Sequence, residues 1–200
     1  MIKYDEGLER IETERLILEL PSESSVPSQV ENINDLEILQ WLLSVSYPHT
    51  TEDALNYARR SRKRQKEERP RTEYDYWMKL KGEEISIGGA ALHKVNLYQG
   101  TGTVGYFVGK NFWRKGYVSE ALGAIIDIAF DKIGLRRIEA QVFEGNLASM
   151  KLLKKFGFRQ EGFQREAVKC RADSKIKDAY LYGLLGSEYE NPMERTPKLA

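Results

Sequence analysis

The residues with the clearest chemical potential lie at positions 104–121, where a predicted strand leads into a predicted helix. The short loop between them contains Arg114, Lys115 and Gly116. The first amides of a helix have no partner inside it, and together with the helix dipole they bind anions. Two cations and a glycine, which lets the backbone approach a ligand, favour this use. The segment therefore predicts an anion site, with an ordinary strand-to-helix turn as the alternative. It matches neither the G-x-G-x-x-G nor the P-loop pattern.

A second block with chemical potential begins at Asn146. Its first four residues are Asn146-Leu147-Ala148-Ser149, and residues 151–158 follow. Taken alone, Asn146 is a good helix N-cap and Ser149 a surface hydroxyl in the first turn. Together the two blocks resemble the GNAT family of acyl-CoA-dependent N-acyltransferases, particularly the RimJ/RimL-type branch that acetylates the N-termini of ribosomal proteins. Residues 13–16 and 178–185 also look like that branch, so the resemblance covers about residues 12–188.

The resemblance implies a site for acetyl-CoA as cosubstrate. The strand before the loop would offer backbone groups to the pantetheine arm, and amides from the loop and the first helical turn would hold the pyrophosphate. Asn146 would contact the pantetheine, and Ser149 would protonate the departing thiolate as the catalytic acid. The implied cofactor-binding residues are Phe107, Val108, Arg114, Lys115, Gly116, Tyr117, Val118, Ser119, Asn146 and Ser149.

Three positions depart from the family's pattern. Val118 stands where the loop commonly ends in glycine or alanine, Leu153 where many relatives have a tyrosine acid, and Thr103 where this branch often has a glutamate. Without that carboxylate base, an α-amine with a pKa of about 8 suits the site better than a lysine amine at about 10.4. We therefore expect a protein or peptide N-terminal α-amine as acceptor. A small amine such as a polyamine or an antibiotic, and a non-catalytic acyl-CoA-binding module, are the alternatives.

The remaining ionisable and aromatic residues are interpreted mainly as structural. His49 and His93 are expected to be ordinary polar residues rather than catalysts. Two distant histidines and one cysteine give no zinc-ligand spacing, so no metal is predicted. The acceptor is expected to contact residues 34–66 and 97–102. Three acids could serve as the base, although each is interpreted as a solvated or salt-bridged surface acid: Glu139, Glu144 and Glu161. The aromatic residues that could line the acceptor site are Trp41, Tyr47, Tyr98, Tyr106 and Tyr180.

The elements that must position these residues follow from hydrophobic periodicity. Alternation predicts strands at 15–20, 74–80, 85–93, 103–109 and 137–143, and a closing hairpin of 158–168 with 179–185. Helical spacing and caps predict helices at 34–43, from Thr50 or Thr51 onward, at 117–133 and at 146–156, with a loop at 22–28. Gly88-Gly89 indicates a bulge or close backbone approach. The expected fold is a single α/β (α+β) domain over residues 1–200, with a core at about 12–188. Its mixed, mostly antiparallel sheet is flanked by helices, and the resemblance adds a splayed central strand pair.

Charge and composition limit the class of protein. With 31 basic and 30 acidic residues the net charge is +1, which argues against a strongly basic nucleic-acid binder. Residues 1–58 carry a net charge of −9, and we hypothesise that this charge attracts a basic peptide. Residues 59–71 carry a net charge of +6. The basic run is interpreted as the solvated end of a helix, with an arm for RNA, phosphates or an acidic partner as the alternative. One cysteine, no signal sequence and no long apolar run predict a cytoplasmic protein without a membrane partner. Ribosome association and a homodimer are further expectations.

Overall fold

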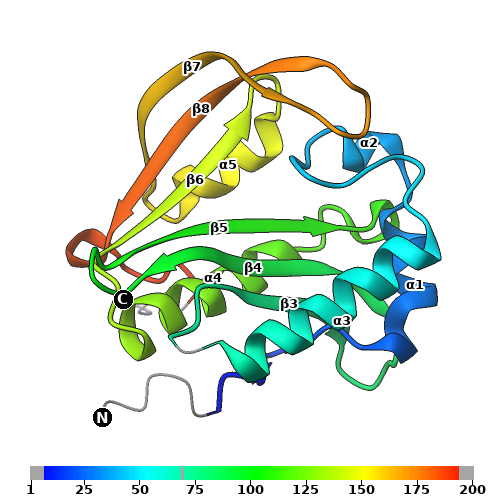
Figure 1. Ribbon diagram of the computed structural model, residues 1–200. Coiled ribbons are helices and arrows are strands. Elements are labelled where there is room, and N and C mark those ends of the chain that lie inside the picture. The colour runs from blue at the N-terminus through cyan, green and yellow to red at the C-terminus, as the bar shows by residue number, and fades with distance from the viewer. Residues whose placement is uncertain (1–6, 69, 194–200) are drawn as a thin grey trace, which may run out of the picture.

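The computed structural model describes residues 7–68 and 70–193, which fold around an eight-stranded sheet (Figure 1). The strand order is β1-β2-β3-β4-β5-β6-β8-β7, and each neighbouring pair is antiparallel except β5 with β6. The expected mixed α/β fold with a mostly antiparallel sheet is confirmed. The strands are β1 (Arg10–Glu12), β2 (Leu16–Glu19), β3 (Tyr74–Leu80), β4 (Ser86–Asn96), β5 (Thr101–Val108), β6 (Arg137–Phe143), β7 (Arg159–Lys169) and β8 (Ile176–Leu185).

Helices cover both faces of this sheet (Figure 1). On one face α1 and α3 pack together over Trp77 of β3, and on the other α4 and α5 enclose the main hydrophobic core. None of the helices in the described ranges is long and apolar enough to cross a bilayer. The α-helices are α1 (Val26–Ile33), α2 (Leu36–Leu39), α3 (Thr51–Glu67), α4 (Tyr117–Asp127) and α5 (Leu147–Lys155). Shorter elements are η1 (Glu23–Ser25), η2 (Lys110–Phe112) and η4 (Gly186–Glu188), and η3 (Ile128–Lys132) is a π-helical continuation of α4.

The sheet divides into two halves where β5 meets β6. These parallel strands pair only over Thr101–Thr103 against Arg137–Glu139. Beyond that point β6 rises away from β5, as Figure 1 shows, and β8 and β7 follow it. The splayed central pair that the resemblance implied is therefore present. As a consequence, residues 104–108 of β5 have no strand partner on the β6 side within the described chain.

Most predicted elements are confirmed, and the errors lie at the edge strand β1 and between β2 and β3. The predicted loop at 22–28 contains η1 and the start of α1, and the predicted helix at 34–43 is helical only over α2. Pro27 occupies the first turn of α1, where a missing amide costs no hydrogen bond. In this segment Leu39 is buried, whereas Leu36 and Leu43 are 40% and 48% exposed. Three α-helices therefore connect β2 to β3 where two were predicted, and the short edge strand β1 was not predicted.

The predicted close approach at Gly88-Gly89 is confirmed. A Cβ atom on Gly88 would lie 2.4 Å from the carbonyl oxygen of Phe107, and one on Gly89 would lie 2.7 Å from the Phe107 ring. The register between β3 and β4 also shifts between Met78 and Lys79. The two glycines thus let β4 pack tightly against the end of β5, which fixes the strand that leads into the Arg114–Gly116 loop.

Candidate active site

The loop after β5 is a tightly wound connection into α4. The indole Nε1 of Trp113 donates to the carbonyl oxygen of Val108 at 3.0 Å, which closes the loop onto the strand. Arg114 and Gly116 both have positive φ, 61° and 83°. Gly116 is the N-cap of α4 and contributes no capping side chain. The backbone therefore turns into the helix without covering the amides of the first turn.

Those amides are the central feature of the site. The amide of Glu120 donates to the carbonyl oxygen of Gly116 at 3.1 Å, the first backbone hydrogen bond of α4. For residues 114–119, no acceptor in the described part of the chain binds the backbone amides. Free amides at a helix N-terminus, with the positive end of the helix dipole, form an anion site. The side chains of Arg114 and Lys115 add positive charge on the same loop.

An ion pair between the half-exposed Arg15 and the buried Glu120 ties this loop to the residues just before β2. The carboxylate of Glu120 is 8% exposed and accepts from the Thr13 hydroxyl (2.5 Å), the Arg15 amide (2.6 Å) and the Arg15 Nε (2.7 Å). Arg15 also donates from Nη1 to the carbonyl oxygen of Lys115 at 3.0 Å and lies 4.8 Å from the centre of the Tyr117 ring. Burial raises the pKa of Glu120, but the hydrogen bonds from Thr13 and Arg15 lower it more, to below its ordinary 4.5. An ionised Glu120 thus holds Arg15 against the loop.

A pair of hydroxyl groups links α5 to β5. Asn146 caps α5 as predicted, because its Oδ1 accepts from the amide of Ser149 at 3.1 Å. The Oγ of Ser149 lies 2.7 Å from the hydroxyl of Tyr106. Burial is the main cause that raises the pKa of Tyr106 to about 12, so this phenol is protonated at neutral pH. The predicted acid Ser149 is therefore connected to a second proton donor.

From the sequence, Tyr106 was predicted only to line the acceptor site. Alternation along β5 places its side chain on the same face as Val104 and Val108, which belong to the main core. That face is covered by α4 and α5, so Tyr106 could have been assigned to the Ser149 side from the strand pattern. The pairing with Ser149 itself has no signal in the sequence.

The other predicted cofactor residues lie along the same path from strand to loop to helix. The side chain of Phe107 packs on the opposite face, against the cluster of Ile33, Ile38 and Leu39. Val118 and Tyr117 pack against the main core. The hydroxyl of Ser119 accepts from Nζ of Lys155 at 3.2 Å.

The predicted candidate bases are mostly engaged in ion pairs. Arg137 binds Glu139 through Nε at 2.9 Å and also forms a short ion pair with Glu161, which lowers the pKa of Glu161. The interpretation of these two acids as salt-bridged is confirmed. Glu144 accepts from the hydroxyl of Tyr180 at 3.5 Å.

The predicted acceptor region is only partly brought together. Trp41 lines a hollow of about 420 Å³ between α2 and the β7–β8 turn. The loop 97–102 instead lies at the end of the sheet where β5 and β6 are still paired. There the amide of Arg136 donates to the carbonyl oxygen of Gly100 at 2.8 Å. Tyr98 on this loop is 94% exposed. The other residues that line the hollow are Gln40, Glu144, Asp173, Lys175, Ile176, Lys177 and Asp178.

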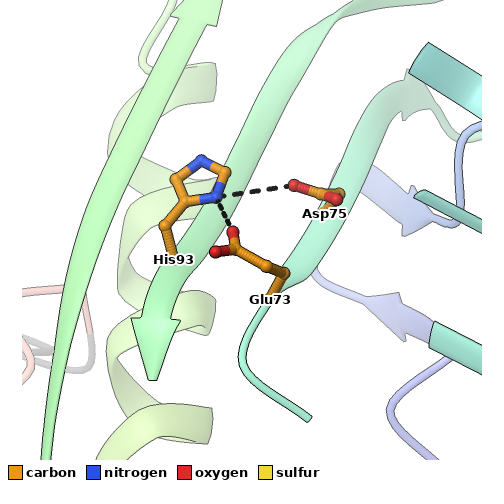
Figure 2. Close-up of side chains that lie close together, drawn as sticks. All are labelled: Glu73, Asp75 and His93. Carbon is orange, nitrogen blue, oxygen red and sulfur yellow. Dashed lines mark hydrogen bonds and ion pairs between the residues drawn. The ribbon is translucent and has the colours of Figure 1, made fainter. Parts of the chain in front are cut away.

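Figure 2 shows a cluster that the sequence did not predict, formed by Glu73, Asp75 and His93. One ligand-type atom from each lies within 4.8 Å of the others. Asp75 is fully buried, and its Oδ2 accepts from Ser61 at 2.8 Å and from Arg64 at 2.9 Å. The cluster is assembled from β4, β3 and the residues just before β3, which explains why residue spacing along the chain gave no indication of it.

Comparison with known proteins relates this arrangement to one family. A family model described as acetyltransferase (GNAT) domain matches residues 15–159. A Bacillus licheniformis protein named uncharacterized N-acetyltransferase p20 is 38% identical over 103 residues, which is 52% of this chain and 57% of that protein. The first curated relatives are matched over 38–63% of their own lengths.

Two solved structures share the fold. Mycobacterium smegmatis RimJ in complex with CoA-disulfide has a TM-score of 0.76 at 19% identity, covering 86% of this chain and 83% of its own. The ribosomal-protein-S5-alanine acetyltransferase from Vibrio fischeri has a TM-score of 0.74 at 19% identity, covering 90% and 98%. At this level of identity the likeness concerns the fold.

Proposed function

The chain belongs to the GNAT acetyltransferase domain family, and on this premise we propose that it transfers an acetyl group from acetyl-CoA to a primary amine. One observation carries the proposal. Along a single path, the described part of the chain has amides at 114–119 for which it offers no acceptor, an edge of β5 that it leaves unpaired at 104–108, and the Tyr106–Ser149 pair. A diphosphate, a pantetheine arm and a thiol require these three environments in this order.

Each cofactor role is assigned to a residue on that path. The backbone amides from Arg114 to Ser119 bind the pyrophosphate, with the charges of Arg114 and Lys115 beside it. Phe107 and Val108 bind the pantetheine through their backbone groups, and Asn146 contacts it from α5. Ser149 delivers a proton to the departing sulfur, and Tyr106 supports that donation through its hydrogen bond.

The acceptor we propose is the N-terminal α-amine of a protein or peptide. Glu139 and Glu161 are held by Arg137, so neither is free to act as a strong base. An α-amine is less basic than a lysine amine and more often neutral at pH 7. The RimJ/RimL-type sequence resemblance supports the same acceptor class. We place the reaction in the cytoplasm, where a single buried thiol, Cys170, stays reduced.

The proposal is tested with purified protein, acetyl-CoA and four amines. These are a peptide with a free α-amine and no lysine, the same peptide with a blocked N-terminus and one lysine, a polyamine, and an aminoglycoside. Thiol release and the mass of the acceptor report transfer. We expect acetylation of the first peptide at the highest rate.

The outcomes separate the alternatives. Preferred acetylation of the polyamine or the aminoglycoside would replace the α-amine by a small-molecule acceptor. Binding of CoA by calorimetry without transfer to any amine would favour a non-catalytic acyl-CoA-binding module. This experiment does not address three further predictions, which are that the reaction needs no metal, that the protein associates with the ribosome and that it forms a homodimer.

A further inference from the structure

His93 has the hydrogen bonding of an oriented base. In Figure 2 its Nδ1 points at Glu73 and Asp75. Nδ1 donates to a carboxylate oxygen of Glu73, and Oδ1 of Asp75 lies 3.6 Å from the same nitrogen. With Nδ1 as the donor, the lone pair of the neutral ring is on Nε2. No residue of the described chain hydrogen-bonds to Nε2, and the side chain is 37% exposed.

The acid beside His93 is held in place and ionised. The second oxygen of Glu73 accepts from the amide of Lys94 at 3.3 Å. Burial raises the pKa of Glu73, but the hydrogen bond and charge of His93, the Lys94 amide and the charge of Arg64 lower it more, to below its ordinary value. Glu73 is therefore a carboxylate at neutral pH and fixes the orientation of the imidazole.

Asp75 has a different role, because Arg64 already neutralises it. Its Oδ2 accepts from Arg64 and Ser61. Burial, and next the charge of Asp75, raise the pKa of the Tyr57 hydroxyl, which faces the same carboxyl group. A cation bound by the three side chains would have to share Asp75 with the Arg64 guanidinium. The charged and titratable groups around His93 are thus Glu73, Asp75, Arg64 and Tyr57, and they favour an imidazole hydrogen-bonded to acids over a metal site.

The imidazole lies at the base of the sheet opening. His93 pairs in register with Thr103, the last residue of β5 that also pairs with β6. A Cβ atom on Gly105 would lie 3.5 Å from Cδ2 and 3.6 Å from Nε2 of His93. The ring therefore covers Gly105, just beyond the point where β5 and β6 separate.

The proton donors lie on the opposite face of the same strand. Successive residues of a strand point to opposite faces, so Gly105 faces His93 while Tyr106 faces Ser149. A thioester held along this part of β5 would have His93 on one side and the Ser149 hydroxyl on the other. An incoming amine and a departing thiol require this separation.

We propose that His93 is the catalytic base that deprotonates the acceptor amine, with Glu73 as its positioning residue. The inference rests on the proposed transferase function. Of the three protons of the acceptor ammonium, one passes to Nε2 of His93 and then to solvent, and one stays on the amide product. The third leaves the nitrogen as the C–N bond forms and the C–S bond breaks, and it passes through solvent to Ser149, which has given its own proton to the departing sulfur. His93 thus supplies the base that the sequence lacks at Thr103.

The test compares His93→Gln with Glu73→Gln and with the control Asp131→Asn, which changes an exposed acid of η3 outside the proposed site. Acetylation of the best acceptor is followed as kcat and KM across about pH 6 to 9.5, and acetyl-CoA affinity is measured by calorimetry. General bases contribute about 10²–10⁴-fold. We expect His93→Gln to lower kcat by about a hundredfold at pH 7 with acetyl-CoA affinity within twofold, and Asp131→Asn to leave kcat unchanged.

The pH profile separates catalysis from packing. In His93→Gln the rate should rise tenfold per pH unit toward the pKa of the free amine, about 8, because only neutral amine reacts. In Glu73→Gln kcat should fall while KM stays within about twofold, because the imidazole loses the carboxylate that orients it but no group that contacts the acceptor changes. Treatment of the wild-type protein with EDTA should change none of these rates.

Each contrary result has a distinct meaning. Wild-type kcat and pH dependence in His93→Gln would overturn the base assignment and leave the transferase function standing. A wild-type kcat in Glu73→Gln would remove Glu73 as positioning residue. Loss of activity on EDTA treatment would replace the base with a metal site. No transfer by the wild-type protein to any amine would overturn the proposed function and this inference together.

Discussion

At the scale of single residues, the hydrogen bond between Ser149 and Tyr106 makes a prediction about leaving-group chemistry. Ser149→Ala removes the hydroxyl next to the departing sulfur, and we expect kcat to fall by at least about tenfold. Tyr106→Phe removes the partner of that hydroxyl and should lower kcat as well. Because the two act on one proton, the double variant should be little worse than the worse single variant. Steady-state kinetics of the four proteins measure this.

Cofactor affinity is the control for both substitutions. Neither side chain lies on the diphosphate loop, so calorimetry should give CoA dissociation constants within about twofold of wild type, which is less than 0.5 kcal/mol. Strictly additive losses in kcat would mean that Ser149 and Tyr106 act independently. Unchanged turnover in Ser149→Ala would remove Ser149 as the acid.

The sequence indicated which residues belong to the site, but not which residues they form hydrogen bonds with. Asn146 and Ser149 were placed by their cap and spacing, and the structure has them where the cap requires. The Tyr106–Ser149 and His93–Glu73 pairs join residues separated by 43 and 20 positions. Such contacts depend on strand register and on the packing of α5, which local periodicity does not encode.

At the scale of elements, the turn into α4 predicts a strict requirement for glycine. Gly116 has a φ of 83°, and Gly134, after η3, has a φ of 76° with nothing within 4 Å of its missing Cβ. An aspartate at either position is strained by about 1–2 kcal/mol. Only Gly116→Asp also places a negative charge at the proposed diphosphate site, so it should weaken CoA binding by at least about tenfold, or about 1.4 kcal/mol.

Gly134→Asp is therefore the matched control for backbone strain. Both variants should lose similar stability in urea titrations, while calorimetry should show weakened CoA binding for Gly116→Asp alone. Equal affinities in the two variants would count against the loop as the diphosphate site, whatever their stabilities.

The ion pair between Arg15 and Glu120 of α4 predicts that the stability of the fold depends on pH. The folded-state pKa of Glu120 lies below the ordinary value of 4.5 that it has in the unfolded chain. Its stabilisation is therefore fully present above about pH 4.5 and is lost as the pH falls through the lower folded-state value. Glu120→Gln should reduce the free energy of unfolding by about 1.5–3 kcal/mol at pH 7, the range for hydrogen bonds to charged groups.

Urea titrations at about pH 7 and pH 3 measure that loss. The difference between wild type and Glu120→Gln should shrink at the lower pH, where Glu120 in the wild type becomes protonated. Thr72→Val, which removes an exposed hydroxyl bonded to Glu68, is the control and should show no such convergence. A pH-independent difference would mean that Glu120 acts through packing and not through its charge.

Element prediction succeeded where a cap or an alternation was strong and failed where helices were short. A cap at Thr50 or Thr51 gave the start of α3, where the structure has a capping box of Thr50 with Asp53. Alternation gave the bounds of β3 and β6. In α2 only four residues are helical, and its position depends on contacts such as that of the Cys170 thiol with the carbonyl oxygens of Leu39 and Gln40. A segment held by tertiary contacts carries little periodicity of its own.

At the scale of the whole molecule, the decisive feature is how weakly the two halves of the sheet are joined. The parallel contact of β5 with β6 involves three residues on each strand, whereas β6 and β8 pair over seven. Hydrophobic patterns predicted each strand but not this difference, since a pattern records which face is buried and not where a ladder stops. The splay came from family resemblance alone.

A ligand that binds across the divergence should therefore stabilise the whole fold. CoA at a hundredfold excess over its Kd adds about 2.7 kcal/mol to the free energy of unfolding, which should raise the Tm of a domain of this size by about 5–10 °C. Adenosine 3′,5′-bisphosphate, which carries phosphates but no pantetheine arm, should bind the loop without bridging β5 to β6. At matched saturation, hydrogen exchange should slow at residues 104–108 and 140–143 with CoA only. Equal protection by both ligands would place the pantetheine outside the opening, because a molecule that reaches only the first turn of α4 cannot contact β6.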